Sequence, residues 1–228
     1  FRTKGMDALQ SLKNTNQYTV LNFDRQSRST TIDLYDFATL KKVSTLIDTK
    51  SFPALANGIN SYTFDASEKL ILIACNTNQI FRHSFTADYY LYNISTKELK
   101  KPFDFQVQEP TLSKKKKKIA YAKGNNLFVY DIASSKTTAI TTDGLKNSII
   151  NGITDWVYEE EFAFVRAFDW SADSKKVAYI RFDESKVPEF SMSMFKKDLY
   201  PTIETFKYPK AGEKNAVVSL HIYDVNSN

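Results

Sequence analysis

The sequence predicts an all-β protein assembled from the four-stranded blades of a β-propeller. Aromatic residues form 14% of the 228 residues, while only six Gly and six Pro occur, a balance that favours strands over a glycine-rich α/β scaffold. One phrase recurs four times: Leu or a β-branched residue, then Tyr, then Asp or Asn, then an apolar residue. Its copies lie at 34–37, 91–94, 129–132 and 222–225. Each copy indicates a strand that runs into a turn, so we expect about four blades.

A second phrase precedes three of these copies and supplies the rest of the blade. This phrase, an apolar segment that ends in Ser, lies at 62–67, 110–113 and 167–171. A short polar turn and an apolar run follow each copy, and we expect buried strands in these runs, at 70–75, 119–122 and 177–180. An apolar strand, a charged turn, a buried strand and an outer strand ending in Tyr-Asp form a unit that is typical of a propeller blade.

The spacing of the repeated tyrosines indicates where the blades carry insertions. Tyr35 and Tyr92 are 57 residues apart, Tyr92 and Tyr130 are 38 apart, and Tyr130 and Tyr223 are 93 apart. A bare blade needs about 40 to 50 residues. We therefore expect insertions at 76–88 and across 151–216, and insertions on a repeat scaffold are common sites of function.

These blades are expected to form part of a larger ring. Four blades closed on themselves are the alternative, but the uneven spacing and a final strand close to Asn228 favour an incomplete ring. An unclosed propeller would leave strand edges unpaired. We therefore expect 1–228 to be part of a propeller domain that has eight blades in the intact protein.

The segment 155–161 places three consecutive carboxylates, Glu159, Glu160 and Glu161, among aromatic and apolar residues. In a strand, Glu160 and Glu161 would point to opposite faces, whereas on a helix neighbours diverge by only about 100° and can approach one ligand. We therefore predict a short helix at 155–161. A pair of carboxylates suits a primary ammonium, which carries a positive charge and three N–H donors. The alternative is a solvated acidic surface with lysine partners.

Charge and cysteine content argue against several other classes of protein. The formal charge is +5, but five positive charges form the run 114–118, which lacks interleaved aromatic residues and is typical of a solvated turn, so no nucleic acid is expected as a partner. Cys75 is the only cysteine, so we expect a buried thiol and no disulfide within the chain. No metal site and no cofactor are predicted. No run approaches the roughly 20 apolar residues of a membrane span.

Several stretches of the sequence resemble the dipeptidyl peptidase IV group of prolyl-oligopeptidase-type serine peptidases. The run 151–161 is similar to the signature of that group, and the Arg-His-Ser stretch at 82–84 is similar to its arginine motif. Segment 182–188 resembles the strand that leads into the extended arm of the family, and 208–212 resembles the motif that closes the arm. The resemblance implies the N-terminal β-propeller of such an enzyme, with an extended arm at 186–212.

The resemblance also implies roles for individual residues. Glu160 and Glu161 would bind the free N-terminus of a peptide, and Arg82 would contact the backbone carbonyl of the penultimate-side residue. Supporting positions would be Glu159, Asp155, Trp156 and Tyr158. The family releases dipeptides from N-termini whose second residue is Pro or Ala. Fixing the ammonium at a set distance from the nucleophile lets only the second peptide bond react.

The bond-breaking groups of the family are not expected in this chain. By the resemblance, the Ser-Asp-His triad belongs to a C-terminal α/β-hydrolase domain, whereas this sequence contains no Gly-x-Ser-x-Gly elbow and only two histidines, His83 and His221. We therefore expect this chain to be inactive alone and the catalytic domain to be absent from it. A non-catalytic propeller that binds protein partners is the alternative function. A tripeptidyl or acylpeptide-type enzyme is disfavoured, because an acylated N-terminus carries no ammonium.

The resemblance further implies partners and a compartment. Segment 186–212 is rich in Phe, Met and Tyr, and in the family this arm reaches a second subunit, so we expect a homodimer. The other expected partners are peptide substrates with a free N-terminus. A Lys-rich composition without disulfides favours a bacterial member, in which the protein is periplasmic, secreted or anchored at the outer surface.

Overall fold

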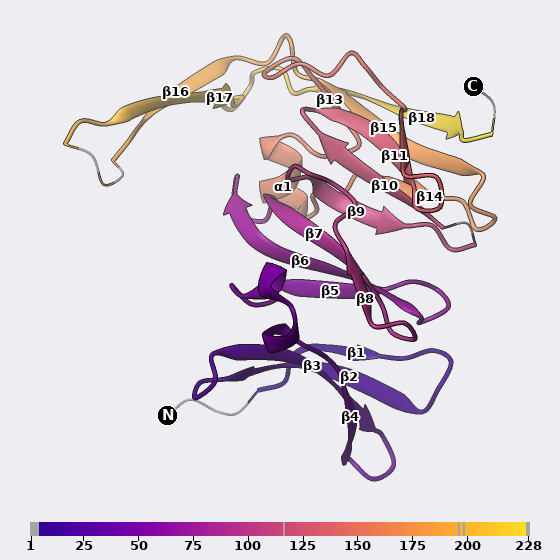
Figure 1. Ribbon diagram of the computed structural model, residues 1–228. Helices are drawn as coiled ribbons and strands as arrows, with labels where there is room; N and C mark the ends of the chain where they lie inside the picture. The colour runs from indigo at the N-terminus through magenta and orange to yellow at the C-terminus, as the bar shows by residue number, and fades with distance from the viewer. Residues whose placement is uncertain (1–4, 116, 196, 198, 227–228) are drawn as a thin grey trace. The chain divides into compact units, whose positions relative to one another are not determined.

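The structure, a computed structural model, describes residues 5–115, 117–195, 197 and 199–226 (Figure 1). The described residues form antiparallel sheets and a single α-helix, α1 (Trp156–Phe162). They divide into two compact units. The first holds the described residues up to Asn78 together with Ala87–Gln106, and the second holds Gln79–Thr86 and the described residues from Val107 onwards. No helix in the described part of the chain has the length and apolar character to cross a membrane.

Two four-stranded sheets form the first unit. One has the order β1 (Asp7–Ser11), β2 (Gln17–Asp24), β3 (Ser29–Asp36), β4 (Lys42–Asp48). The other has the order β5 (Ser61–Phe64), β6 (Leu70–Gln79), β7 (Phe85–Asn93), β8 (Glu98–Lys100). Two short 3-10 helices, η1 (Thr49–Ser51) and η2 (Pro53–Leu55), lie between β4 and β5. The predicted burial of Cys75 is confirmed, because its thiol lies in the core of this unit and burial raises the thiol pKa to about 11.

The second unit contains two further sheets and a two-stranded arm. One sheet has the order β12 (Lys136–Ala139), β11 (Asn126–Asp131), β10 (Lys118–Lys123), β9 (Gln108–Leu112). In the other, β15 (Lys176–Asp183) pairs with β18 (Val217–Asp224) along one edge and with β13 (Ile149–Asn151) and β14 (Phe168–Trp170) along the opposite edge. The expected arm at 186–212 is confirmed as β16 (Glu189–Met194) paired with β17 (Thr202–Lys207).

Every copy of the repeated Tyr phrase ends a strand, as the sequence predicts. The strands β3, β7, β11 and β18 end at Asp36, Asn93, Asp131 and Asp224. A side-chain oxygen of each accepts a backbone N–H two or three residues further on, which closes the turn. The four sheets therefore confirm the four predicted blades.

The expectation that the Tyr strand is the outer strand of its blade is wrong for three of the four copies. β3, β7 and β11 are the third strands of their sheets, and β4, β8 and β12 lie beyond them. These fourth strands are mostly exposed. They consequently lack the apolar pattern by which the other strands are recognised.

Helix α1 is an insertion at the edge of the last blade. β13 and β14 pair in succession with the same edge of β15, and the segment between them leaves the sheet. Its two ends are tied together, because the N–H of Ala167 donates to the carbonyl of Gly152 at 2.9 Å and that of Thr154 donates to the carbonyl of Val165 at 3.0 Å. The predicted insertion at 151–216 thus holds both the helix and the arm, and the one at 76–88 is the β6–β7 hairpin tip.

Candidate functional site

Helix α1 begins at a buried, capped N-terminus. The carboxylate of Asp155 accepts the N–H of Tyr158 at 2.9 Å, which satisfies one of the free donors of the first turn. Burial raises the pKa of Asp155, while this N–H acts in the opposite direction. The helix ends where Ala163 takes a left-handed φ of 54°. The helix predicted at 155–161 is therefore confirmed, and it begins one residue later because Asp155 serves as its cap.

Aromatic contacts hold this short helix at two places. A helix of two turns is marginal in water without tertiary packing. The ring of Tyr158 lies 5.0 Å, between centroids, from that of Phe182 in β15. The ring of Trp156 lies 4.9 Å from that of Tyr208 and 5.9 Å from that of Phe206, at the base of the arm. Both expected supporting aromatic residues thus fix the helix in the second unit.

The buried carboxylate of Glu159 joins the helix to the β6–β7 hairpin tip. Glu159 is only 1% exposed. Its Oε1 accepts the backbone N–H of His83 at 2.7 Å and that of Ser84 at 2.8 Å. Charge-assisted bonds of this kind are stronger than neutral ones. The resemblance named Glu159 only as supporting, and the contact itself could not be deduced from the sequence, because it joins segments about 75 residues apart.

The next residue of the helix meets the side chain of the same hairpin tip. Glu160 Oε2 lies 3.0 Å from Arg82 Nε, and the side chains are 15% and 73% exposed, respectively. The structure thus brings together three of the residues singled out from the sequence, Arg82, Glu159 and Glu160. It places them on α1 and on Gln79–Thr86, which belong to the same unit.

Glu161 lies apart from these contacts. It is exposed and lines a surface pocket of about 250 Å³ together with Trp156, Val157 and residues of the segment 208–213 that follows β17. The approach of Glu160 and Glu161 to a single ligand stays a prediction.

A cavity of about 430 Å³ lies beside the start of α1 and the base of the arm. Phe81, Trp156 and Phe206 supply aromatic walls, and Glu159 also lines the cavity. The cavity can therefore accept apolar groups next to carboxylates. The described residues contain no group of three or more His, Cys, Asp or Glu side chains that could hold a metal ion.

Glu184, a further carboxyl group, also lines this cavity and was not singled out as a site residue from the sequence. Burial raises its pKa to about 7, the charge of Asp155 adds to the increase, and Lys207 opposes it. The sequence signal, a Glu directly after an apolar strand, is weak, because the burial of this position depends on segments that are distant in the chain.

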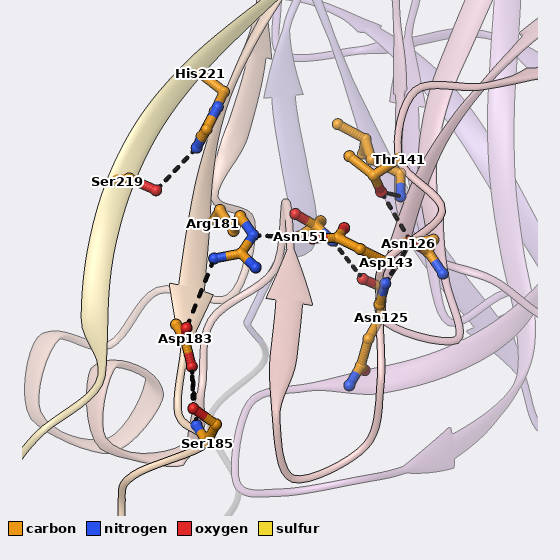
Figure 2. Close-up of polar contacts among 12 residues, drawn as sticks. Asn125, Asn126, Thr141, Asp143, Asn151, Arg181, Asp183, Ser185, Ser219 and His221 are labelled. Carbon is orange, nitrogen blue, oxygen red and sulfur yellow. Dashed lines mark hydrogen bonds and ion pairs between the residues drawn. The ribbon is translucent and has the colours of Figure 1, made fainter.

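A polar network fastens the insertion to the neighbouring blade of the same unit (Figure 2). Asn151 Nδ2 donates to Asp143 Oδ1 at 2.8 Å and to the carbonyl oxygen of Asn125 at 3.3 Å. Arg181 of β15 pairs with the other oxygen of Asp143 at 3.0 Å. Gly152 has a φ of +75°, and a Cβ at this position would lie only 2.9 Å from a methyl carbon of Leu127. The Asn-Gly pair that begins the run 151–161 therefore has a packing role.

The four blades form a partial β-propeller. Helix α1 and the β6–β7 hairpin tip, which carries Arg82, form a polar site inserted into it. Residues 65–228 match the family model described as the dipeptidyl peptidase IV (DPP IV) N-terminal region. The chain belongs to this family.

Curated relatives and solved structures agree with this assignment. The probable dipeptidyl-aminopeptidase B of Talaromyces marneffei is 38% identical over 176 residues, which cover 70% of this chain and 19% of the relative. The human prolyl endopeptidase FAP is 31% identical over 206 residues, which cover 87% of this chain and 26% of that protein. The crystal structure of Porphyromonas gingivalis dipeptidyl peptidase 4 is similar with a TM-score of 0.89 and 37% identity, over 99% of this chain and 32% of that chain. The chain thus spans no more than about a third of these proteins.

Proposed function

We propose that this chain is the substrate-binding propeller part of a dipeptidyl peptidase IV-like serine exopeptidase, which releases Xaa-Pro or Xaa-Ala dipeptides from peptides with a free N-terminus. The Ser-Asp-His triad would then belong to a C-terminal hydrolase domain of the same protein. Family membership and the names of the similar proteins support this proposal. The observation that carries it is the ion pair between Arg82 and Glu160 on the inserted helix.

The charges around α1 suit a peptide N-terminus. Helix α1 carries three carboxylates, Glu159, Glu160 and Glu161, and Arg82 neutralises the charge of Glu160, so the group keeps a net negative charge that attracts a substrate ammonium. Glu160 uses one oxygen for Arg82 and keeps the other as an acceptor. An ammonium offers three N–H donors, which carboxylate oxygens satisfy better than neutral acceptors do.

Arg82 has donors left for the substrate. Its guanidinium carries five N–H donors, and the ion pair with Glu160 is made through Nε. The terminal nitrogens of this largely exposed side chain can therefore donate to a peptide carbonyl. Binding the ammonium and a carbonyl together would fix the register of the peptide, so that only the second peptide bond reaches the nucleophile.

The test is hydrolysis of a Gly-Pro substrate by the full-length protein and by its Glu160→Gln and Glu161→Gln variants. Both substitutions keep the size of the side chain and remove its charge. We expect kcat/KM to fall about 30-fold to 1,000-fold for each, because a close charge pair is worth about 2–4 kcal/mol. Glu98→Gln, the same change at an exposed position on β8, is the control and should retain wild-type kcat/KM.

Two results would contradict this function. Wild-type kcat/KM in both Glu160→Gln and Glu161→Gln would contradict the proposal that these carboxylates bind the substrate ammonium. A folded full-length protein that does not hydrolyse the substrate would favour the alternative, a non-catalytic propeller that binds protein partners.

We also propose that the intact protein is a homodimer formed through the arm. The described part of the arm exposes several large apolar side chains, Phe195, Leu199, Tyr200 and Ile203 among them. A two-stranded ribbon is at best marginally stable alone, and exposed large apolar side chains gathered on one element favour an interaction surface. A second copy of the protein would cover these side chains.

A further inference from the structure

Consecutive residues of α1 hold consecutive residues of the hairpin tip. Glu159 binds the backbone N–H groups of His83 and Ser84, whereas Glu160 pairs with the side chain of Arg82. The helix therefore holds the tip twice, through a buried contact to the backbone and through an exposed contact to the side chain.

The internal hydrogen bonds of the hairpin tip set its shape but do not attach it to the helix. The N–H of Ile80 donates to the carbonyl of Ser84 at 2.8 Å, and the N–H of Phe81 donates to Ser84 Oγ at 3.1 Å. Gln79 Nε2 donates to the carbonyl oxygens of Phe81 and Arg82 at 2.5 Å and 3.1 Å. These bonds all lie within the tip, so its position against α1 depends on other contacts.

Of the two contacts to the helix, the one through Glu159 is the stronger. Arg82 is 73% exposed, and solvent screening together with side-chain entropy makes an exposed ion pair weak. The Glu159 carboxylate is buried and receives two backbone N–H bonds on one oxygen, in surroundings that strengthen charge-assisted bonds. The ion pair is therefore expected to add little to the attachment of the tip.

We infer that Glu159 is a positioning residue, whose carboxylate fixes the hairpin tip against α1 and thereby sets the Arg82 guanidinium beside Glu160 and the peptide carbonyl. This inference rests on the proposed function. Its carboxylate is buried and bound to the hairpin backbone, so Glu159 acts on the substrate through the backbone on which Arg82 sits.

The surroundings of the second carboxylate oxygen of Glu159 indicate how Glu159→Gln should differ from Glu159→Ala. Oε2 of Glu159 is buried and has no hydrogen-bond partner among the described residues. Glu159→Gln keeps an oxygen acceptor for the two N–H groups but replaces the unpartnered oxygen by a buried amide NH2, whose two donors carry a desolvation cost. Glu159→Ala removes the acceptor altogether, so the tip loses its buried attachment.

The experiment is a double-mutant cycle in the full-length protein, with kcat/KM for a Gly-Pro substrate as the readout. Arg82→Ala and Glu159→Ala are each expected to lower kcat/KM by about 100-fold, the cost of misplacing a substrate-positioning group by about 1 Å. The double variant should be no slower than Arg82→Ala alone, because Glu159 has no effect once the guanidinium is gone. Glu159→Gln should lose less activity than Glu159→Ala, since both backbone bonds keep an acceptor.

A fall in kcat/KM of about 10,000-fold in the double variant, the product of the two single falls, would overturn the inference. It would show that Glu159 affects the reaction independently of Arg82. Wild-type kcat/KM in Glu159→Ala would overturn it as well. If Glu159→Ala does not fold, Glu159→Asp takes its place in the cycle, since a side chain shorter by one methylene cannot reach both N–H groups. Wild-type kcat/KM in both Glu160→Gln and Glu161→Gln would instead contradict the ammonium site of the proposed function, so the two failures are distinguishable.

Discussion

Glu184 is an acid whose protonation depends on folding. It is buried beside the cavity, and its pKa rises from an ordinary value of 4.5 to about 7. Between these two pH values the folded protein keeps a proton that the unfolded chain has already released. The stability contributed by protonated Glu184 is therefore fully present below pH 4.5 and is lost as the pH rises through 7.

Replacing this acid by its neutral isostere should remove that dependence. The Gln side chain of Glu184→Gln cannot ionise. The difference between the melting temperature of the variant and that of the wild type should therefore increase from pH 5 to pH 8, and the variant should be the more stable protein at pH 8. The measurement is thermal unfolding of both full-length proteins at the two pH values, with the exposed Glu98→Gln as the matched control. An equal difference in melting temperature at pH 5 and pH 8 would show that Glu184 ionises normally.

At the scale of elements, the base of the arm contacts both parts of the candidate site. The ring of Phe206 in β17 lies 6.2 Å from that of Phe81 and 5.9 Å from that of Trp156. Phe81 precedes Arg82 in the hairpin tip, and Trp156 is the first residue of α1. A single side chain of the arm therefore supports the two segments that carry Arg82 and Glu160.

Truncating this side chain should affect both stability and activity. Phe206→Ala is expected to lower the free energy of unfolding by about 2 kcal/mol, less than for a fully buried Phe because the residue is half-buried. It should also lower kcat/KM for a Gly-Pro substrate, because the hairpin tip and the helix lose a common support. Phe23→Ala, on the exposed face of β2, should change stability by no more than about 0.5 kcal/mol. A lower melting temperature with unchanged kcat/KM would show that the arm base only stabilises the fold.

At the scale of the whole molecule, the exposed apolar residues of the arm lead to a prediction about assembly. Leu199 is 88% exposed, and Ile203 of β17 is 66% exposed. Replacing both by Asp places charges in the proposed dimer contact, where desolvation of an unpaired charge is costly. We expect the full-length wild type to sediment as a dimer and the Leu199→Asp/Ile203→Asp variant as a monomer.

A matched control separates this effect from a general loss of solubility. Val43→Asp introduces the same type of charge at an exposed position of β4 and should remain dimeric. A wild type that sediments as a monomer, or a double variant that stays dimeric, would contradict a contact through the arm.

The blade turns and the helix, which the structure confirms, were predictable from short-range chemistry. Asp131 closes its turn through N–H groups two and three residues away, and Asp155 caps a helix through the N–H of Tyr158. Such contacts can be deduced from sequence spacing alone, which is why the repeated blade unit and the helix are both predictable. The exposed fourth strands of the blades are not, because their burial pattern is set by neighbours and not by their own residues.

By itself, the sequence predicted propeller blades interrupted by an acidic helix, and its resemblance to the family implied the arm and named Arg82, Glu160 and Glu161 as candidate site residues. Only the tertiary structure decided that Glu159 holds the backbone next to Arg82 and that Glu184 is a buried acid. The physical reason is distance along the chain: Glu159 meets its two N–H donors 75 and 76 residues away, and Glu184 owes its raised pKa to burial and to Asp155. Packing creates such contacts, and no local pattern of residues encodes them.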